Sequence, residues 1–489
     1  MVRKVSIIIS TFLIVLAGTF FGVQFMAKTG VFKVFGKVYY DESLNEAETE
    51  ALKTIFNEEV KLDKDVSFSA YDTFEWPELN ENEFLVNIYV PVTDFYDMRD
   101  GVSFETPEEF FSEALKEESS FKVIDISELD YKFRLLELNG AYYLDDLKAG
   151  AVFRVVKAES EYFSEEILPL IGEIFTRTLP SKETILTFAQ TGVTALSRRM
   201  NTKMNQVGSG AYFAEGIKDF LSSFDLTHTS NESSFSNYAS ASNICSDRRF
   251  FETLTMIGLD IVELTGNHNV DCGDASASES IDIYVNNGIR VVGGGKNAEE
   301  AALPLQIEQK GNNITMFAYN LSTGGATHDN TPGANQYYEE VASEQISSAK
   351  ARGDFVIVDI QYYECNEYAS TTEDTTCDYA GSMAGDQVGF FRHLIDLGAD
   401  IVVGTSAHQP QTFELYGDGV IYYGLGNLFF DQFWWPGTTR SLVLVHYFKD
   451  GELLQTRIMP TVYDSNMRTE LMSGEDRRWF LERLANARP

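Results

Sequence analysis

Side chains that could do chemistry gather in the segment at 262–273. Asn267 offers an amide oxygen, His268 an imidazole and Asp271 a carboxylate, which are groups that bind cations or transfer protons. A short apolar run precedes them, so the pattern predicts a buried strand that delivers these groups at its carboxyl end. Open α/β sheets bind ligands at that edge. The structural alternative is a helix N-terminus capped by Asn267 or Asp271, with His268 packed nearby.

Other loops in the second half of the chain also carry polar groups directly after apolar runs. The residues concerned are Arg198, Asn231 and Glu232, the stretch 361–364, His408 and Gln411 in the loop 404–411, and Asn427. Several such loops at one edge of a sheet indicate a pocket.

The elements that must position these loops are short apolar strands alternating with helices from residue 184 onward. We predict strands at 184–189, 261–265, 289–292, 314–319, 355–360 and 401–403, then hairpin-like strands at 411–416, 420–423, 440–447 and 453–459. This order predicts a layered α/β domain with a mixed sheet at 183–460. The remaining residues, 461–489, form a C-terminal extension whose short amphipathic helix carries Trp479, Phe480 and Leu484.

The region at 38–182 is strongly acidic and rich in aromatic residues. Helices are predicted at 46–57 and 106–116 and strands at 83–92, 142–145 and 151–156. We therefore expect a smaller mixed α/β accessory domain, whose residue types indicate no particular chemistry.

Length and charge narrow the function classes. A chain of 489 residues with 44% hydrophobic content is long enough for two folded domains. Its 74 acidic residues against 38 basic ones give a formal charge of -36. Binding to nucleic acid needs clustered Lys and Arg, so nucleic acid is not an expected partner.

The N-terminus predicts a membrane anchor. Arg3 and Lys4 precede an uncharged apolar run at 5–26, which is long enough to span a bilayer as a helix. Because positive charge stays in the cytoplasm, we expect a single-pass protein of the cell membrane, with a connector to residue 37 and extracellular C-terminal domains. A cleaved signal peptide is the alternative.

Four cysteines lie in the part of the chain that would be exported: Cys245, Cys272, Cys365 and Cys377. Export permits disulfides, and four cysteines allow three pairings. A bond between Cys365 and Cys377 would close a local loop, whereas a bond between Cys245 and Cys272 would tie an upstream segment to the candidate site loop.

The combination of these loops resembles the CapA family, named for the synthesis of the poly-γ-glutamate capsule. The resemblance covers residues 183–460 and implies a fold like that of calcineurin-type metallophosphoesterases. The motifs that carry it are Asn231-Glu232, Thr265-Gly266-Asn267-His268, the glycine-rich turn at 293–295 with the Ala-x-x-Pro step at 301–304, the approach at 399–404 to an Ala-His-Gln-Pro-Gln loop, and Tyr423-Gly424-Leu425-Gly426-Asn427.

The sequence also departs from the related phosphoesterases. Gly192 is followed by Val193 where those enzymes carry a bridging aspartate, and the stretch 361–363 replaces a His-Trp-Gly motif. The histidine loop keeps only His408, with Ser406 in place of the first histidine. A two-metal centre needs more anionic or imidazole ligands than this set provides.

The resemblance assigns roles residue by residue. Glu232, Asn267 and His408 are candidate ligands of one divalent metal ion of unknown identity, with Asp271 or Glu364 as further candidates. His268 and His408 are candidate general acids, and Arg198, Gln411 and Asn427 are candidate substrate-binding groups. The alternatives are structural histidines, a surface or helix-capping carboxylate at Glu232 and a salt bridge at Arg198.

We therefore expect a membrane-anchored CapA-like protein that acts in the synthesis, export or anchoring of an anionic surface polymer, alone or with its synthase complex. Whether it is an enzyme stays open at this point. The competing hypothesis is a metal-dependent hydrolase that cleaves a phosphoester or amide in such a polymer.

Overall fold

A computed structural model describes residues 38–55, 66–159, 171–172, 175, 181–321, 324–362, 387–405, 407–433 and 436–489. The chain divides into two compact units. Unit 1 comprises Met1–Thr93, Asp100–Leu129 and Leu135–Ser181, and unit 2 comprises Asp94–Arg99, Asp130–Arg134 and Lys182–Pro489. Each unit is described separately.

Some predicted features fall outside the described ranges. They are the anchor and connector at 1–37, Cys365 and Cys377, Glu364 and Ser406. Within the ranges that are described, no helix is both long enough and apolar enough to cross a bilayer.

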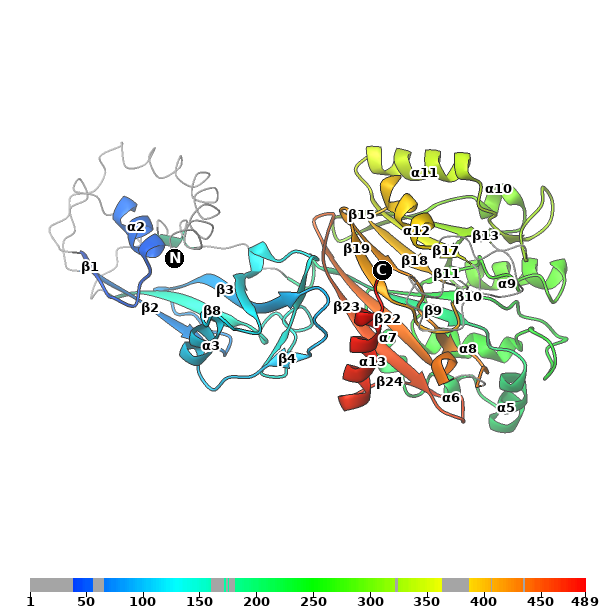
Figure 1. Ribbon diagram of the computed structural model, residues 1–489, viewed down its shortest axis with the longest axis horizontal. Coiled ribbons are helices and arrows are strands. Elements are labelled where there is room, and N and C mark those ends of the chain that lie inside the picture. Colours follow the sequence, from blue (N-terminus) through cyan, green and yellow to red (C-terminus); the bar gives the residue numbers. More distant parts are fainter. Residues whose placement is uncertain are drawn as a thin grey trace. The chain divides into compact units, whose positions relative to one another are not determined.

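Unit 1 is built on an antiparallel sheet with one parallel pair at its edge. The strands run in the order β1 (Val38–Tyr40), β2 (Val66–Thr73), β8 (Val152–Glu159), β3 (Glu83–Asp94) and β5 (Lys122–Asp125), with β1 and β2 parallel. Helices α2 (Glu46–Ile55) and α3 (Pro107–Ala114) accompany it (Figure 1). The Thr106 side chain caps α3 by accepting from the Glu109 amide at 3.3 Å, as the capping pattern predicts.

One strand predicted in unit 1 is wrong. Residues 142–145 form a turn, in which the Asp145 amide donates to the Tyr142 carbonyl at 3.0 Å. Tyr142, Tyr143 and Leu144 are buried, so the apolar run that suggested a strand serves core packing. The acidic pair Asp145 and Asp146 follows at once and favours a turn.

Unit 2 contains two mixed sheets that pack face to face. The first has the order β12 (Arg290–Val292), β11 (Ile261–Glu263), β10 (Leu226–Asn231), β9 (Leu186–Thr194), β22 (Arg440–Lys449), β23 (Glu452–Tyr463) and β24 (Thr469–Leu471), and β21 (Asn427–Phe429) also pairs with β9. The second has the order β14 (Leu305–Gln309), β15 (Asn312–Asn320), β17 (Phe355–Gln361), β18 (Ile401–Gly404), β20 (Gly419–Tyr422) and β19 (Phe413–Tyr416).

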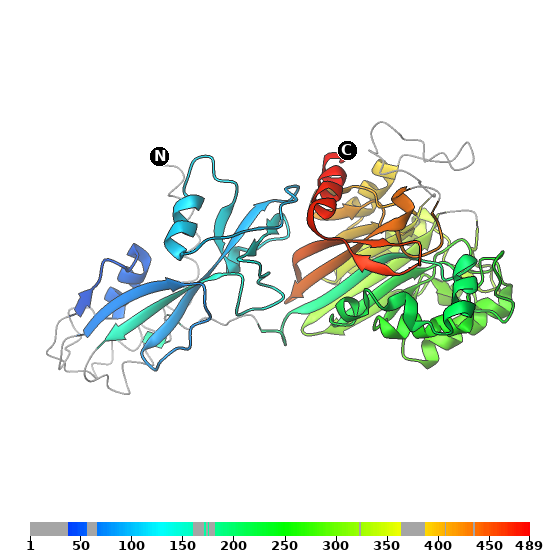
Figure 2. The ribbon, with the colours of Figure 1, turned by 90° about the horizontal axis from the view of Figure 1, so that it is seen from below.

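The core of unit 2 lies between these sheets. Phe188, Leu226 and Leu442 of the first sheet share one buried cluster with Ile357 and Ile401 of the second. Figure 2 shows the two sheets as stacked layers. The layered α/β class with mixed sheets is confirmed, and the ten strands predicted in this half of the chain correspond to β9, β11, β12, β15, β17, β18, β19, β20, β22 and β23.

Helices cover the outer faces. α11 (Glu339–Ala351) and α12 (Gln387–Asp396) pack on the second sheet through Ile346 and Phe391 against Val358 and Val402. α5 (Arg199–Val207), α6 (Ala211–Ala214), α7 (Lys218–Leu221), α8 (Phe251–Met256) and α9 (Asp274–Asn286) lie on the side of the first sheet (Figure 1). The C-terminal helix α13 (Gly474–Asn486) buries Phe480, Leu481 and Leu484.

A buried polar cluster bridges the two sheets inside this core. Gln190 on β9 donates to Asp359 on β17 at 2.6 Å, and the same carboxylate lies 3.2 Å from Nε2 of His228 on β10. Nε2 of His446 on β22 lies 3.2 Å from the Gln190 amide oxygen. All four side chains are fully buried. The cluster explains why β9 continues past its apolar part, since its polar residues find partners on other strands.

Candidate functional site

The polar loops lie at the carboxyl ends of parallel strands. β9, β10, β11 and β12 are parallel neighbours in the first sheet, and β15, β17, β18 and β20 are parallel neighbours in the second. The loops after β10, β11, β17 and β18 therefore leave each sheet at one edge. Hydrogen bonds between loops of different sheets, described next, show that the two edges coincide.

The first group of site residues joins β10, β11 and β17. Glu232 follows β10 and is fully buried. A Cβ atom at Gly266 would lie 2.7 Å from the Cα of Glu232, so only glycine allows this loop to approach it so closely. Gln361, at the end of β17, donates to the Asn267 amide oxygen at 3.3 Å. Asn320, at the end of β15, donates to the Thr265 carbonyl at 2.7 Å.

The second group surrounds His408. This histidine is 2% exposed, and its Nδ1 lies 2.9 Å from the Asn427 amide oxygen. The Asn427 nitrogen donates to the Gln432 side chain at 3.1 Å and to the Thr438 carbonyl at 2.9 Å. Because the amide oxygen can only accept, Nδ1 carries the proton and Nε2 is the basic nitrogen of the neutral ring.

Arg198 belongs to the same group through Phe430. Its guanidinium carbon lies 4.5 Å from the Phe430 ring centroid, and the His408 ring lies 5.3 Å from the same ring. Arg198 also forms an ion pair with the buried carboxylate of Asp431. The salt-bridge alternative for Arg198 is therefore present in the structure. The backbone φ of Arg198 is 50°, which is unusual for a residue other than glycine. The ion pair with Asp431 and the contact with the Phe430 ring hold the Arg198 side chain in place.

Two other candidates have partners outside these groups. His268 is half-buried and its Nδ1 lies 2.8 Å from the Asp271 carboxylate. Gln411 is buried and accepts from the Gln387 side chain at 3.1 Å. The proposal that Asn267 or Asp271 caps a helix is wrong, because α9 begins after Gly273 and has no side-chain cap.

The site loop is fixed at both ends. The Glu263 carboxylate accepts from the Thr265 amide at 2.5 Å, and burial raises the pKa of this carboxyl. A disulfide joins Cys245 to Cys272, the bond that the sequence analysis named as a possible tie between an upstream segment and this loop. The hydrogen bond to Glu263 therefore fixes the loop where it leaves β11, and the disulfide fixes it just before α9.

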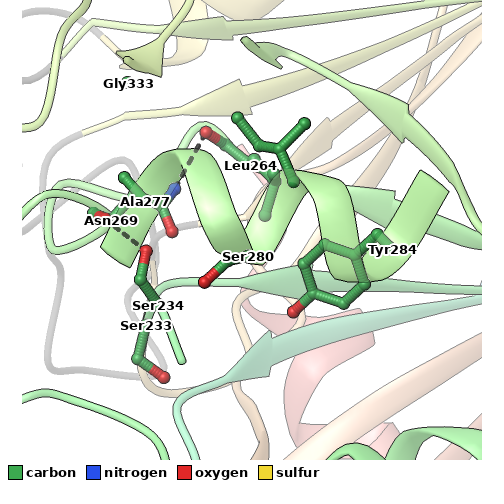
Figure 3. A pocket seen from close by; sticks show the side chains of 9 residues that line it. Ser233, Ser234, Leu264, Asn269, Ala277, Ser280, Tyr284 and Gly333 are labelled. Carbon is green, nitrogen blue, oxygen red and sulfur yellow. Dashed lines mark hydrogen bonds between the residues drawn. The ribbon is translucent and has the colours of Figure 1, made fainter. Parts of the chain in front are cut away.

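A small cavity lies beneath the same loop, lined by Ser233, Ser234, Ser280 and Tyr284 among others (Figure 3). Its volume of about 10 Å³ gives room for about one water molecule. Asn269 donates to the Leu264 carbonyl at 2.9 Å and its own carbonyl accepts from Ser234 at 2.5 Å. The cavity is too small for a substrate, and its hydrogen bonds shape the loop.

The position of the missing aspartate is filled by apolar packing. Val193 is fully buried in a small cluster with Ala195 and Phe430. Within the described ranges, no three His, Cys, Asp or Glu side chains are placed to hold a metal ion. The described residues therefore do not fit a two-metal centre, while the single-ion set of Glu232, Asn267 and His408 stays a prediction.

Several residues of the site were not assigned a role from the sequence. They are Phe430 and Asp431, which hold Arg198, and Asn320, which holds the Thr265 carbonyl. Asn320 could have been found, because it directly follows the apolar strand predicted at 314–319. Asp431 gives no such signal, since its partner lies 233 residues away in the sequence.

Two mixed sheets packed face to face, with helices outside and polar loops at one common edge, define an α/β sandwich protein with an edge-of-sheet site. The sequence profile of the family described as "Bacterial capsule synthesis protein PGA_cap" matches residues 187–432, about half of the 489 residues. The chain therefore belongs to this CapA family of poly-γ-glutamate capsule synthesis proteins, and the resemblance stated from the motifs is confirmed.

Curated relatives agree with this assignment. The PGA biosynthesis protein CapA of Bacillus subtilis is 28% identical over 204 residues, which cover 41% of this chain and 50% of the relative. The capsule biosynthesis protein CapA of Bacillus anthracis is 23% identical over 280 residues, covering 54% and 65%. A probable polyglutamine synthesis accessory protein of Mycobacterium tuberculosis is 24% identical, covering 47% and 63%. The chain thus matches between half and two-thirds of each relative's length.

Among solved structures, the crystal structure of TT1561 of Thermus thermophilus aligns with 55% of this chain and all of its own, at 11% identity and a TM-score of 0.29. A likeness of this size carries no argument about fold or function.

Proposed function

We propose that this protein acts in the synthesis, export or anchoring of a poly-γ-glutamate-like surface polymer, by binding and assembly rather than by catalysis. The observation that carries the proposal is the family match, because residues 187–432 include the strand ends and loops that carry Glu232, Asn267 and His408. The relatives named for capsule biosynthesis and for an accessory role in polymer synthesis support a place beside a synthase.

The location completes the proposal. A protein that handles a surface polymer works at the cell envelope, and the basic residues before the apolar run at 5–26 favour a single-pass anchor with the two units outside the cell. The disulfide between Cys245 and Cys272 supports an oxidising compartment. The fold implied by the family, that of the calcineurin-type metallophosphoesterases, would here serve as a scaffold.

The electrostatics of the second site group favour binding over metal-assisted hydrolysis. The Asp431 carboxylate forms an ion pair with Arg198, and Nδ1 of His408 donates a hydrogen bond to Asn427. Val193 replaces the carboxylate that would bridge two cations. In this tautomer Nε2 of His408 is a hydrogen-bond acceptor, the type of group that pairs with the N–H donors of an amide polymer.

Deletion of the gene in its host tests the proposed function. We expect the amount of surface poly-γ-glutamate to fall, and the intact gene to restore it. An unchanged amount of polymer would contradict the proposal.

The second candidate function is a hydrolase with one metal ion. Metal analysis of the purified full-length chain distinguishes it from the assembly role. Bound metal would be measured for the wild type, for His408→Ala and for His393→Ala, a histidine on α12 that is exposed and pairs with Glu339 at 2.7 Å. One equivalent of metal that is lost only in His408→Ala would support the hydrolase. Metal-free protein that still binds polymer supports the assembly role.

A further inference from the structure

An exposed tryptophan with two neighbouring arginines lies beyond the family-matched segment. Trp479 on α13 is 49% exposed. The guanidinium carbon of Arg440, at the start of β22, lies 5.5 Å from the Trp479 ring, and that of Arg483 lies 5.9 Å from it. We call these three residues the basic-aromatic surface.

Core packing does not require this tryptophan. α13 turns Phe480, Leu481 and Leu484 into the core, where they are fully buried. Trp479 and Arg483 are one helical turn apart on the exposed side of the same helix. A large aromatic side chain facing solvent between cations therefore has no structural role in the described core, and such groups are frequent in binding surfaces.

The local charge is opposite to that of the whole chain. Acidic residues outnumber basic ones by 74 to 38 overall. Within residues 474–489 the balance reverses, with four arginines (Arg477, Arg478, Arg483 and Arg488) and three carboxylates (Glu475, Asp476 and Glu482), and Arg440 adds a further cation beside Trp479. An anionic chain that the protein surface repels elsewhere would be attracted here.

Buried backbone contacts connect the start of β22, which carries Arg440, to the His408 group. Thr438 accepts through its carbonyl from Asn427, the partner of His408, and Arg440 follows two residues later. The carbonyl oxygen of Arg440 lies 2.5 Å from the position that a Cβ at Gly426 would take, so the two backbones touch.

We propose that Arg440, Trp479 and Arg483 bind a polycarboxylate chain, namely the γ-linked glutamate polymer, and this inference rests on the proposed function. Guanidinium groups pair with carboxylates through two parallel hydrogen bonds. The indole face offers a flat apolar contact to the methylene groups and amides between successive carboxylates. The surface thus matches both the charge and the alternating polarity of such a polymer.

Fluorescence anisotropy of dye-labelled poly-γ-glutamate with the full-length chain tests this surface. We expect Arg483→Glu and Trp479→Ala each to weaken binding at least about fivefold, with the binding lost at high salt. Arg483→Lys keeps the charge but not the paired geometry and should fall between. The matched control is Lys148→Glu, which reverses an exposed cation 5.5 Å from Trp76 in unit 1 and should bind like the wild type.

The outcomes separate the surface from the function. Wild-type binding that none of the α13 variants weakens overturns the surface, while the proposed function stands on the gene deletion. A wild-type chain that does not bind the polymer also overturns the surface, whereas the function falls only if deletion leaves the polymer unchanged. If the variants lose binding to phosphatidylglycerol vesicles but keep polymer binding, the surface binds lipid headgroups and the proposal is wrong.

Discussion

His446 is a fully buried histidine whose ring nitrogens are held by Gln190 and by Thr456, the latter at 2.9 Å. Burial, and secondarily the charge of His228, lowers the pKa of His446 from 6.5 to about 3. Burial also raises the pKa of the Asp359 carboxyl, which accepts from the same Gln190 side chain that contacts His446. The neutral imidazole is therefore the form that the fold selects.

This pKa shift predicts a loss of stability in acid. Between pH 6.5 and 3 the unfolded chain takes up a proton at His446 that the folded chain refuses, so the free energy of unfolding falls as the pH is lowered. Relative to His446→Gln, the wild type should lose up to about 1.4 kcal/mol per pH unit in that window. Urea unfolding at a series of pH values checks this. Parallel pH profiles of the two proteins would contradict it.

The sequence predicted where the site residues lie on the strands but not which residues they contact. The loops that carry Asn267, Glu232 and His408 were predicted at strand ends, and the structure places them there. Their partners were not predicted, because contacts such as that of Asn267 with Gln361 join residues 94 positions apart. The catalytic, metal-binding and substrate-binding roles of these residues stay predictions.

At the scale of elements, apolar periodicity located most strands of unit 2, since buried parallel strands read as continuous apolar runs. The end of β9 was missed. Its predicted end was 189, but the strand runs to Thr194, because Gln190 and Thr191 are satisfied by other strands rather than by water. From the sequence alone, Gln190 and Thr191 looked like the end of the strand, because the residues that bind their side chains could not be identified.

The disulfide between Cys245 and Cys272 is an element-scale constraint on the site loop. It closes a loop of 27 residues, so Cys245→Ser with Cys272→Ser should lower the free energy of unfolding by about 2–4 kcal/mol. Thermal unfolding under non-reducing conditions measures the loss. As a control, reductant should lower the stability of the wild type. It should not lower the stability of the double variant through this bond, because the bond is absent there. Equal stability of both proteins would contradict the expectation.

At the scale of the whole molecule, the two units are not consecutive in the sequence. Residues Asp94–Arg99 and Asp130–Arg134 come from the N-terminal half but belong to unit 2. There Phe95 and Tyr96 pack on Phe413, with ring centroids 5.7 and 6.1 Å apart. Gln455 donates to the Asp130 and Phe133 carbonyls, each at 2.9 Å. Changes in composition along the chain cannot reveal that these two short segments belong to unit 2.

A fragment of residues 182–489 should therefore be less stable than unit 2 within the full chain. Phe95 and Tyr96 are half-buried, so losing the packing of either alone would cost about 1–2 kcal/mol. Differential scanning calorimetry of the fragment and the full chain measures the difference. Phe95→Ala in the full chain is the matched control and should reproduce part of the loss. A fragment that melts at the temperature of the full chain would show that these segments are dispensable.

The bond between Cys245 and Cys272 also decides how samples of this protein should be prepared. A bacterial cytoplasm holds thiols reduced, so chains purified from it would carry a site loop without its covalent tie. Periplasmic or secreted production would yield the oxidised form. Free-thiol titration of each batch before any binding measurement would tell the two apart, and laboratories using different hosts would otherwise be comparing two different molecules.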